Sequence, residues 1–596
     1  MSGRHMLEYA HRLAAREASV RRLERLQARI GATRLLLVAM TLVLAWVSWG
    51  QRWLSALWML APAAAFTCAV AYHAVLRRRG ALAARAVGFY RWGLARLEDR
   101  WAGMGIRGDR FADVHHVYGA DLDLFGEASL FELLCAARTR MGEETLAGWL
   151  LAPAPAAEVV QRQSCVLDLR DRLDLRERIA MLGSGPEPVL RPERLLAWAE
   201  APNVLGAGWT RVAACLLPLL LVAALIAGHL TGIWSPVAAV LAIEAVALYR
   251  LKGRLNEVLL PAERAFDFDG LKTFAGLLTA IERERFGSPP MRSLAAGTSA
   301  DGVRASVRIG RLATVVMLSE QRKNLMVSWL QVPLLYLLHV ALAAERWRRA
   351  YGKSVRAWME AAGRFEALSS LAQYSFEHPD HPFPVFLEGR ACLRAVGLGH
   401  PLMPPARSVR NDVNFSGGER VWLVSGSNMS GKSTLLRAVG LNVVLAMAGA
   451  PVTAQVFELT ALQVGASIRI NDSLREGSSR FYAEITRLRQ LRDLSGREPW
   501  LLFLIDEMLQ GTNSNDRRIG AQGVLGALIE QGAIGLATTH DLALTELAGL
   551  ADGVLRNMHF EDQLQDGVMR FDYRLREGVV TKSNGLELMR AIGLRV

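Results

Sequence analysis

Long apolar runs interrupt the first half of the chain in two pairs. Residues 35–50 carry no charge, and after a short polar break residues 53–76 are again uncharged. A second pair follows at residues 212–234 and 235–249. Runs of about 16 to 24 apolar residues are at or just below the length of a helix that spans a bilayer. The pattern therefore predicts two hydrophobic helical hairpins.

Basic residues flank both hairpins at their outer ends, and tryptophans gather around the first turn. The basic residues are Arg21, Arg22, Arg25, Arg29, Arg34, Arg77, Arg78, Arg79, Arg211, Arg250, Lys252 and Arg254. The tryptophans are Trp46, Trp49, Trp53 and Trp58. The positive-inside rule places such flanks in the cytoplasm, and interfacial tryptophans are typical of a membrane boundary. Pro62, His73 and Glu244 would be costly against lipid, so two hairpins buried in a soluble core remain the alternative.

The remaining first half reads as mostly helical. Residues 8–34 form a basic amphipathic pattern, which fits either a solvated helix or one lying along anionic lipid headgroups. Helical patterns continue over residues 86–205 and 255–385, with a Gly/Ser/Pro-rich gap near 287–302. A third apolar run, 327–343, contains glutamine, proline and histidine, which favours a buried core helix.

A glycine-rich loop follows a short apolar run in the second half: VWLVSGSNMSGKST at residues 421–434, before a helical pattern. This is G-x-x-x-x-G-K-[ST] in strand–loop–helix context, which predicts a phosphate-binding loop. Gly426 and Gly431 let successive N–H groups face the phosphates. Lys432 would reach the β- and γ-phosphates, and Ser433 would offer its hydroxyl to Mg²⁺.

Two further apolar strands end in polar residues that a nucleotide hydrolase needs. Residues 500–507 read WLLFLIDE, a buried parallel strand ending in two carboxylates. Asp506 would hold Mg²⁺ and Glu507 would polarise the attacking water. A second strand, AIGLATTH, ends at His540, which is placed to contact the γ-phosphate or to orient water.

These segments resemble the MutS family. Asn428 and Met429 match its Asn-Met pair, and DEMLQGTNSNDR, ATTHDLALTELA and TKSNGLELMRAIGL are similar to its Walker B loop, switch-histidine segment and closing helix. The similarity extends to VGASIRINDSLREGSSRFYAEI, TRMGEETLAGWLLAP and GHP in the ATPase and core domains.

The resemblance implies a dimer in which Ser478 and Ser479 contact the partner's nucleotide. The implied nucleotide-binding residues are Gly426, Ser427, Asn428, Met429, Ser430, Gly431, Lys432, Ser433, Thr434, Ser478 and Ser479, with Lys432, Glu507 and His540 in catalysis and Ser433 and Asp506 on the metal.

The chain departs from the family pattern in several places. Met508, Leu509 and Gln510 replace the usual Ile-Gly-Arg, and no segment before the first hairpin has room for the Phe-x-Glu mismatch module. No strand-rich insert of the size of a DNA clamp is visible within 257–385. The sequence FSGGER at 415–420 resembles the ABC-transporter signature, but it precedes the phosphate loop, and we interpret it as a hairpin turn.

The composition of the chain does not distinguish a nucleic-acid partner from a membrane partner. The chain has 596 residues, 51% of them hydrophobic, and a net charge of +13, which suits nucleic acid or an anionic membrane surface. Its five cysteines lack metal or redox spacing and read as reduced thiols.

The expected fold is an α/β P-loop ATPase domain with a mostly parallel sheet, like that of MutS and ABC proteins, C-terminal to a mostly α-helical core. The expected parts are a basic helix (1–34), a first hairpin (35–79), the first part of the core (86–205), a second hairpin (212–250), the second part of the core (255–385) and the ATPase domain (386–596). The expected function is that of a homodimeric, Mg²⁺-dependent ATPase. It would bind mismatched or distorted DNA while tethered to the bacterial inner membrane, with its ATPase domain in the cytoplasm. The alternative is a membrane-embedded ATPase that drives transport or membrane remodelling without DNA.

Overall fold

A computed structural model describes most of the chain. The described residues are 2–50, 55–183, 190–205, 208–265, 268–300, 303–324, 329–427, 429–469, 480–550, 553–565 and 568–580. The chain forms two compact units. Unit 1 comprises Met1–Gly105, Leu173–Met181 and Phe376–Asp380, and unit 2 comprises Ile106–Arg172, Leu182–Ser375 and His381–Val596.

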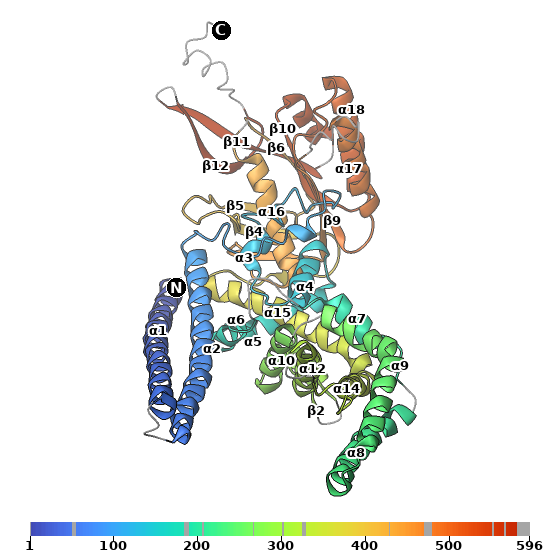
Figure 1. The fold of residues 1–596 in the computed structure, drawn as a ribbon. Coiled ribbons are helices and arrows are strands. Elements are labelled where there is room, and N and C mark those ends of the chain that lie inside the picture. Colours follow the sequence, from blue (N-terminus) through green and yellow to red (C-terminus); the bar gives the residue numbers. More distant parts are fainter. Residues whose placement is uncertain are drawn as a thin grey trace. The chain divides into compact units, whose positions relative to one another are not determined.

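Unit 1 is built on a long antiparallel helix pair, drawn in blue in Figure 1. Its elements are α1 (Ser2–Ala45), a π-helical turn (Trp46–Gly50), a 3₁₀ turn (Ala56–Met59), α2 (Leu60–Leu97) and α6 (Leu173–Ala180). Helix α1 runs without a break across residue 34, so the expected basic helix and the first apolar run form one continuous helix.

The base of this pair is closed by a small core of aromatic and polar side chains. Tyr9, Phe89, Tyr90 and Phe376 pack together there. The Tyr9 hydroxyl donates to Glu377 Oε1 at 3.0 Å, and Arg96 Nε donates to Glu377 Oε2 at 2.6 Å. Because all three polar side chains are buried, the base of the hairpin is held by a buried ion pair and not by apolar contacts alone.

The first half of unit 2 is helical, as the sequence predicts. Its helices are α3 (Leu130–Leu134), α4 (Arg140–Leu151), α5 (Ala156–Arg170), α7 (Pro192–Glu200), α8 (Gly208–Thr231), α9 (Ser235–Ala265), α10 (Phe268–Arg283), α11 (Pro289–Gly297), α12 (Ala305–Glu320), α14 (Tyr336–Tyr351) and α15 (Val355–Glu377). The Gly/Ser/Pro-rich gap holds α11 and a two-stranded hairpin of β1 (Ser299–Ala300) and β2 (Val303–Arg304). Within the described part of residues 257–375 these two short strands are the only sheet.

Three stretches of the described residues are long and apolar enough to cross a membrane, judged by length and composition: Gly3–Trp49, Leu57–Leu97 and Gly208–Thr231. Only 6%, 11% and 22% of their most apolar windows are buried within the protein. Helix α9, which forms the second half of the second hairpin, is not among them. Apolar side chains left exposed along such stretches need a non-aqueous environment or a partner.

A six-stranded sheet organises the C-terminal region, in the order β12-β11-β6-β10-β9-β8. Its strands are β6 (Val421–Ser425), β8 (Leu462–Ser467), β9 (Trp500–Ile505), β10 (Ile534–Thr539), β11 (Leu555–Gln565) and β12 (Val568–Glu577). Strands β8, β9, β10, β6 and β11 pair in parallel, and only β12 runs antiparallel to its neighbour. The carboxyl ends of the parallel strands therefore share one edge, where α/β proteins bind ligands.

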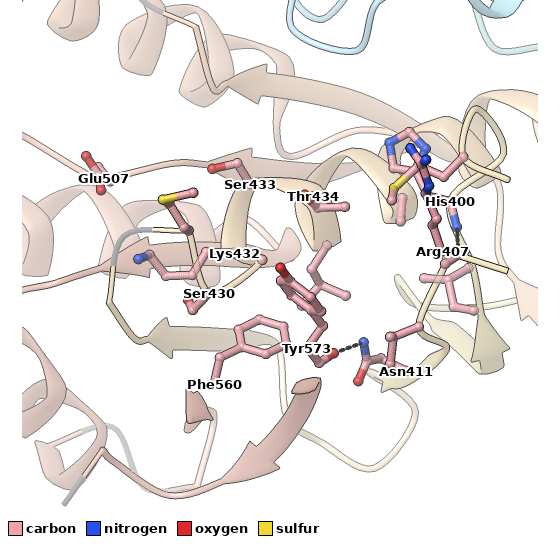
Figure 2. Close-up of a pocket in the computed structure, with 18 residues that line it drawn as sticks. His400, Arg407, Asn411, Ser430, Lys432, Ser433, Thr434, Glu507, Phe560 and Tyr573 are labelled. Carbon is pink, nitrogen blue, oxygen red and sulfur yellow. Dashed lines mark hydrogen bonds between the residues drawn. The ribbon is translucent and has the colours of Figure 1, made fainter. Parts of the chain in front are cut away.

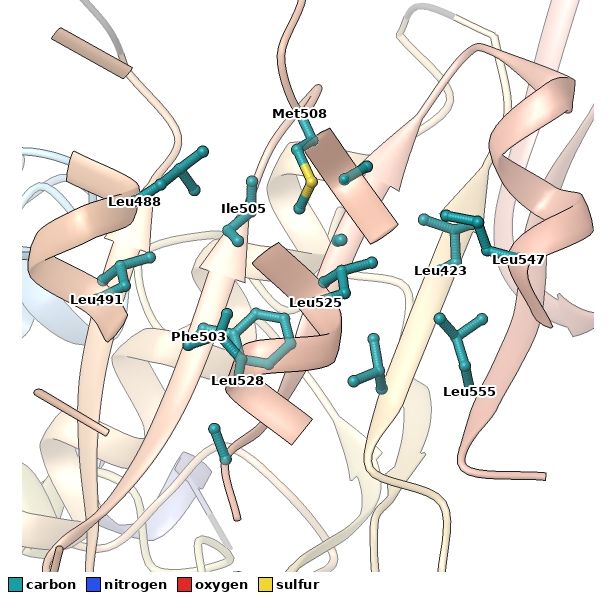
Figure 3. Close-up of a cluster of buried hydrophobic side chains, with 14 of the residues drawn as sticks. Leu423, Leu488, Leu491, Phe503, Ile505, Met508, Leu525, Leu528, Leu547 and Leu555 are labelled. Carbon is teal, nitrogen blue, oxygen red and sulfur yellow. The ribbon is translucent and has the colours of Figure 1, made fainter. Parts of the chain in front are cut away.

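Helices cover both faces of this sheet. On one face, Phe503 and Ile505 pack with Leu525 and Leu528 of α18 (Ser514–Glu530) and with Leu491 of α17 (Arg480–Leu494), as Figure 3 shows. On the opposite face lies α16 (Lys432–Ala448), which approaches Leu504 so closely that a Cβ on Gly440 would come within 2.7 Å of its side chain. Adjacent strand residues point to opposite faces, so the uninterrupted apolar run of β9 reflects burial on both sides.

A smaller four-stranded sheet, in the order β3-β7-β4-β5, combines three strands from before the phosphate loop with one strand from after α16. Its strands are β3 (Val385–Phe386), β4 (Leu393–Leu398), β5 (Asn411–Asn414) and β7 (Val456–Leu459). The expected hairpin turn at residues 415–420 is wrong, because β5 pairs with β4 while β6 pairs with β10 and β11. The segment instead passes the chain from one sheet to the other.

Candidate nucleotide-binding site

The glycine-rich loop joins β6 to the first residue of α16. Gly426 and Gly431 have φ values of 152° and 105°, a region that favours glycine, and Met429 lies at 71°. The Lys432 ammonium folds back on the loop and donates to the carbonyls of Gly426 (2.7 Å) and Ser427 (2.8 Å). Burial lowers the pKa of Lys432, and the nearby Glu507 and Asp506 carboxylates oppose this shift. The lysine is thus a buried cation held close to the loop.

Hydroxyl and carboxylate oxygens meet beside this lysine at the carboxyl edge of the sheet. Ser433 Oγ, in the first turn of α16, donates to Asp506 Oδ2 at 2.5 Å, and the Thr538 hydroxyl donates to Asp506 Oδ1. The backbone N–H of Glu507 donates to Thr538 Oγ1 at 2.9 Å. Because Mg²⁺ prefers hard oxygen ligands from one or two carboxylates and hydroxyls, Ser433 and Asp506 fit a magnesium site.

Glu507 and His540 come from adjacent strands and lie near each other. Glu507 has a φ of 53°, an uncommon conformation that turns the chain at the end of β9. Its carboxylate accepts a hydrogen bond from Gln510, and His540 Nδ1 lies 3.9 Å from Glu507 Oε1. Both side chains remain partly exposed. A carboxylate and an imidazole close to a phosphate loop can polarise or orient a water molecule.

A cavity of about 720 Å³ opens beside the loop, and Figure 2 shows the residues that line it. It is lined by Leu398, His400, Met403, Arg407, Ser408, Val409, Asn411, Met429, Ser430, Gly431, Lys432, Ser433, Thr434, Leu435, Ala438, Glu507, Phe560 and Tyr573. This volume lies in the range of small-molecule sites, and its walls are mainly apolar with a polar, cationic end.

The Asn411 side chain holds one wall of this cavity through two hydrogen bonds to backbone groups. Asn411 Nδ2 donates to the Tyr573 carbonyl at 3.0 Å, and Asn411 Oδ1 accepts from the Leu575 N–H at 2.8 Å. The Tyr573 ring lies against the glycine loop, since a Cβ on Gly431 would come within 3.1 Å of it. Burial lowers the pKa of His400 to about 4, so this histidine is a neutral lining group.

Most of the residues that the sequence singles out gather at this site. Met429, Ser430, Gly431, Lys432, Ser433, Thr434 and Glu507 line the cavity, and Gly426, Ser427, Asp506 and His540 lie against its loop and carboxylates. Asn428, Ser478, Ser479 and the closing segment 581–594 lie outside the described residues. Sequence reasoning missed Arg407, Phe560 and Tyr573 as cavity residues. His400 belongs to the segment GHP, and Asn411 follows it closely in the sequence. The sequence marked this segment as similar to the MutS family but predicted no function for either residue.

A segment of the helical region reaches the same edge of the sheet. Asp121 is buried, and its Oδ1 accepts the backbone N–H groups of Ile468 (2.8 Å) and Arg469 (2.6 Å) just beyond β8. The Asp121 carbonyl accepts from Arg437 Nε of α16 at 3.2 Å. The Ser467 carbonyl accepts the Asp506 N–H at 2.9 Å. Residues near 121 thus contact both the phosphate-loop helix and the strand end next to the candidate metal ligand.

Comparison with known proteins covers the region that holds this site. Residues 422–595 match the family model MutS domain V. The C-terminal region of this chain belongs to the MutS family. The matched segment contains the phosphate loop and the strands that carry Asp506, Glu507 and His540.

Curated relatives match less than half of the chain. "DNA mismatch repair protein MutS 2" of Halobacterium salinarum is 33% identical over 259 residues, covering 43% of this chain and 28% of the relative. "Endonuclease MutS2" of Thermus thermophilus is 35% identical over 219 residues (35% and 27%), and "DNA mismatch repair protein MutS" of Sorangium cellulosum is 32% identical over 254 residues (41% and 26%). The chain therefore spans less than a third of the length of these relatives.

Proposed function

We propose that this chain is a Mg²⁺-dependent ATPase of the MutS type. The observation that carries the proposal is the convergence of Lys432, Ser433 and Asp506 at the mouth of a cavity of about 720 Å³. In this assignment the loop N–H groups and Lys432 bind the phosphates of ATP, and Ser433 and Asp506 hold Mg²⁺. Bound Mg²⁺ would neutralise charge on the β- and γ-phosphates.

Other residues of the site are assigned to the remaining steps of ATP binding and hydrolysis. Glu507 accepts a proton from, or orients, the attacking water, and His540 steadies that water or the γ-phosphate from the neighbouring strand. Phe560 and Tyr573 add aromatic surface to the cavity beside the glycine loop, where they would cover the bound nucleotide. We further propose that two copies of the chain pair so that Ser478 and Ser479 complete the partner's site, as the family resemblance implies.

The proposed output is ATP-dependent switching on DNA at a membrane. The DNA part is supported by relatives named for DNA mismatch repair and by the net charge of +13. The membrane part is supported by the three long apolar stretches whose side chains remain exposed. ATP binding and hydrolysis would bias the helical region through contacts such as that of Asp121 with Ile468 and Arg469. The protein would then lie in the inner membrane of a bacterium, with its ATPase region in the cytoplasm.

Two substitutions test the ATPase assignment. Lys432→Ala removes the buried cation, and we expect at least about a hundredfold weaker ATP binding. Glu507→Gln keeps the size of the side chain but not its basicity, so we expect ATP binding to persist while turnover falls at least about a hundredfold. Equilibrium binding of a fluorescent ATP analogue and steady-state phosphate release measure the two effects. Normal hydrolysis in either variant would contradict the assignment.

A second function, without DNA, is favoured by the exposed apolar helices alone. In that case the ATPase would drive transport or membrane remodelling. The two functions differ in the ATPase rate of nanodisc-held protein with no DNA, homoduplex, mismatched duplex and branched DNA at fixed salt. A rate or ATP affinity that responds to distorted DNA supports the first function, whereas intact turnover that ignores every DNA supports the second.

A further inference from the structure

The helix pair of unit 1 carries a band of arginines just below its apolar end. Arg21, Arg22, Arg25, Arg29, Arg77, Arg78 and Arg79, all exposed, make up this band, which we call the arginine collar. The two helices are in register there, because Gln27 of α1 donates to the Leu76 carbonyl of α2 at 3.1 Å. Residues 21–29 and 77–79, far apart in sequence, therefore lie at the same level of the pair.

The collar residues of α1 share one face of the helix. At 100° per residue, Arg21, Arg22, Arg25 and Arg29 fall within about a quarter of the circumference. Leu23, Leu26, Gln27 and Ile30 occupy the opposite side and are partly buried toward α2. The charged face of α1 is thus set by the packing of the pair, and it points away from the neighbouring helix.

The collar carries a charge that the described protein does not neutralise. Arg21 lies 3.8 Å from Glu17, but among the described residues no carboxylate lies within ion-pair distance of Arg22, Arg25, Arg29, Arg77, Arg78 or Arg79. The only acidic residue between positions 21 and 34 is Glu24, and none lies between 77 and 97. A surface with this excess of guanidinium groups complements phosphate.

The side chains between the collar and the turn of the helix pair identify the source of that phosphate. Leu36, Leu42 and Trp49 are 65%, 66% and 71% exposed, and Trp58 is 60% exposed. Arginines at one end of an apolar stretch and exposed tryptophans at its other end, around the turn, match the order of phosphate, hydrocarbon and opposite interface across a bilayer. A nucleic acid would be met by the arginines but would leave the apolar end exposed to water.

We propose that the arginine collar binds the headgroups of anionic phospholipids and makes unit 1 an anchor selective for anionic membranes. The inference rests on the proposed membrane tether. It adds the lipid class and the depth of insertion. Tyr9, at the packed base, lies 26 residues before the apolar run begins at Leu35. At 1.5 Å per residue the base would be about 40 Å from the hydrocarbon.

The experiment compares vesicle association of the full chain with that of two matched variants. Detergent-purified protein is diluted into vesicles of phosphatidylcholine alone or with added phosphatidylglycerol, and the bound fraction is measured by flotation. The collar variant is Arg22→Gln/Arg25→Gln/Arg29→Gln. The control is Arg489→Gln/Arg492→Gln/Arg497→Gln, which removes the same charge from exposed positions in or just after α17. Unchanged ATPase activity confirms that each variant is folded.

We expect wild type and control to bind the phosphatidylglycerol vesicles more strongly than the phosphatidylcholine vesicles. In the collar variant the ratio of the two affinities should fall at least about tenfold. Equal binding of all three proteins to both vesicles would overturn the collar and leave the tether intact. Failure of all three to bind any vesicle would overturn the tether itself, and the collar with it. Loss of affinity for duplex DNA at fixed salt in the collar variant, with unchanged lipid preference, would assign the arginines to nucleic acid and overturn the proposal.

Discussion

The α/β region and the N-terminal helix pair differ in where their apolar side chains lie. In the α/β region Phe503 and Leu525 are buried, and the polar chemistry lies at the strand ends. In unit 1, Leu36 and Trp49 are 65% and 71% exposed, while Arg96 and Glu377 are only 4% and 2% exposed. Water drives the apolar strands of the α/β region inward. The proposed membrane tether would give the exposed apolar side chains of unit 1 a second, apolar solvent, so the comparison teaches how one chain would be adapted to two solvents.

The largest effect should come from breaking the buried ion pair of unit 1. Arg96→Ala leaves Glu377 buried without its cation, and we expect a loss of about 3–5 kcal/mol in local stability. Amide hydrogen exchange at the base of α1 and α2 measures this loss. Arg91→Ala is the control, because its ion pair with Glu17 is exposed and should contribute at most about 1 kcal/mol. Equal protection in the two variants would show that the base is held by its aromatic side chains alone.

A pair of leucines sharpens the comparison between the two regions. Leu525→Ala opens a cavity in the α/β core, and we expect a loss of about 2–5 kcal/mol in the free energy of unfolding. Leu36→Ala changes an exposed position, so its effect in detergent should be within about 0.5 kcal/mol. Both changes in the free energy of unfolding are measured by denaturant titration, with loss of ATP binding as the readout of unfolding. A large loss from Leu36→Ala would mean that the tip packs against protein.

The contact between the helical region and the strand edge should give a moderate effect. Asp121→Ala leaves the buried-side N–H groups of Ile468 and Arg469 without their acceptor, which we expect to cost about 1–3 kcal/mol. Asp123→Asn removes the charge of a partly exposed partner of Arg469 and keeps a side chain that tolerates the φ of 52° at this position, so it should cost less than about 1 kcal/mol. Hydrogen exchange near residue 468 and Mg²⁺-dependent ATP affinity measure the result. An identical response of the two variants would contradict a specific role for Asp121.

The smallest effect concerns pH and a histidine in the cavity wall. Burial holds the pKa of His400 at about 4, below the unfolded value of about 6.5. The unfolded chain therefore binds the extra proton first as pH falls. His400 is accordingly expected to lower stability as pH drops from about 6.5 toward 4, with no effect above that window. Unfolding of wild type and His400→Gln across this range isolates the histidine, and parallel pH profiles would refute the assignment.

The sequence predicted the residues that carry the chemistry of the site better than the residues that line its cavity. The phosphate loop, Asp506 and Glu507 follow fixed local spacings, so each was visible before any fold was known. Phe560 and Tyr573 belong to an ordinary strand pair, and nothing in their neighbourhood marks them as cavity residues. The turn at 415–420 shows the same limit. Local residues predict a turn there, but strand pairing with distant segments decides which sheets it joins.

The sequence by itself determined the features that depend on residues close together in the chain. These are the glycine loop, the apolar length of the helices, the basic flanks and the strand that ends in Asp506 and Glu507. The tertiary structure decided what depends on distant partners. It brought Asn411 to Tyr573, Asp121 to Ile468, and Arg96 to Glu377. It also set residues 21–29 beside 77–79, which turned two runs of arginines into one charged band. Spacing along a helix or strand fixes the first kind of feature, whereas the second exists only once the packing of whole elements has been chosen.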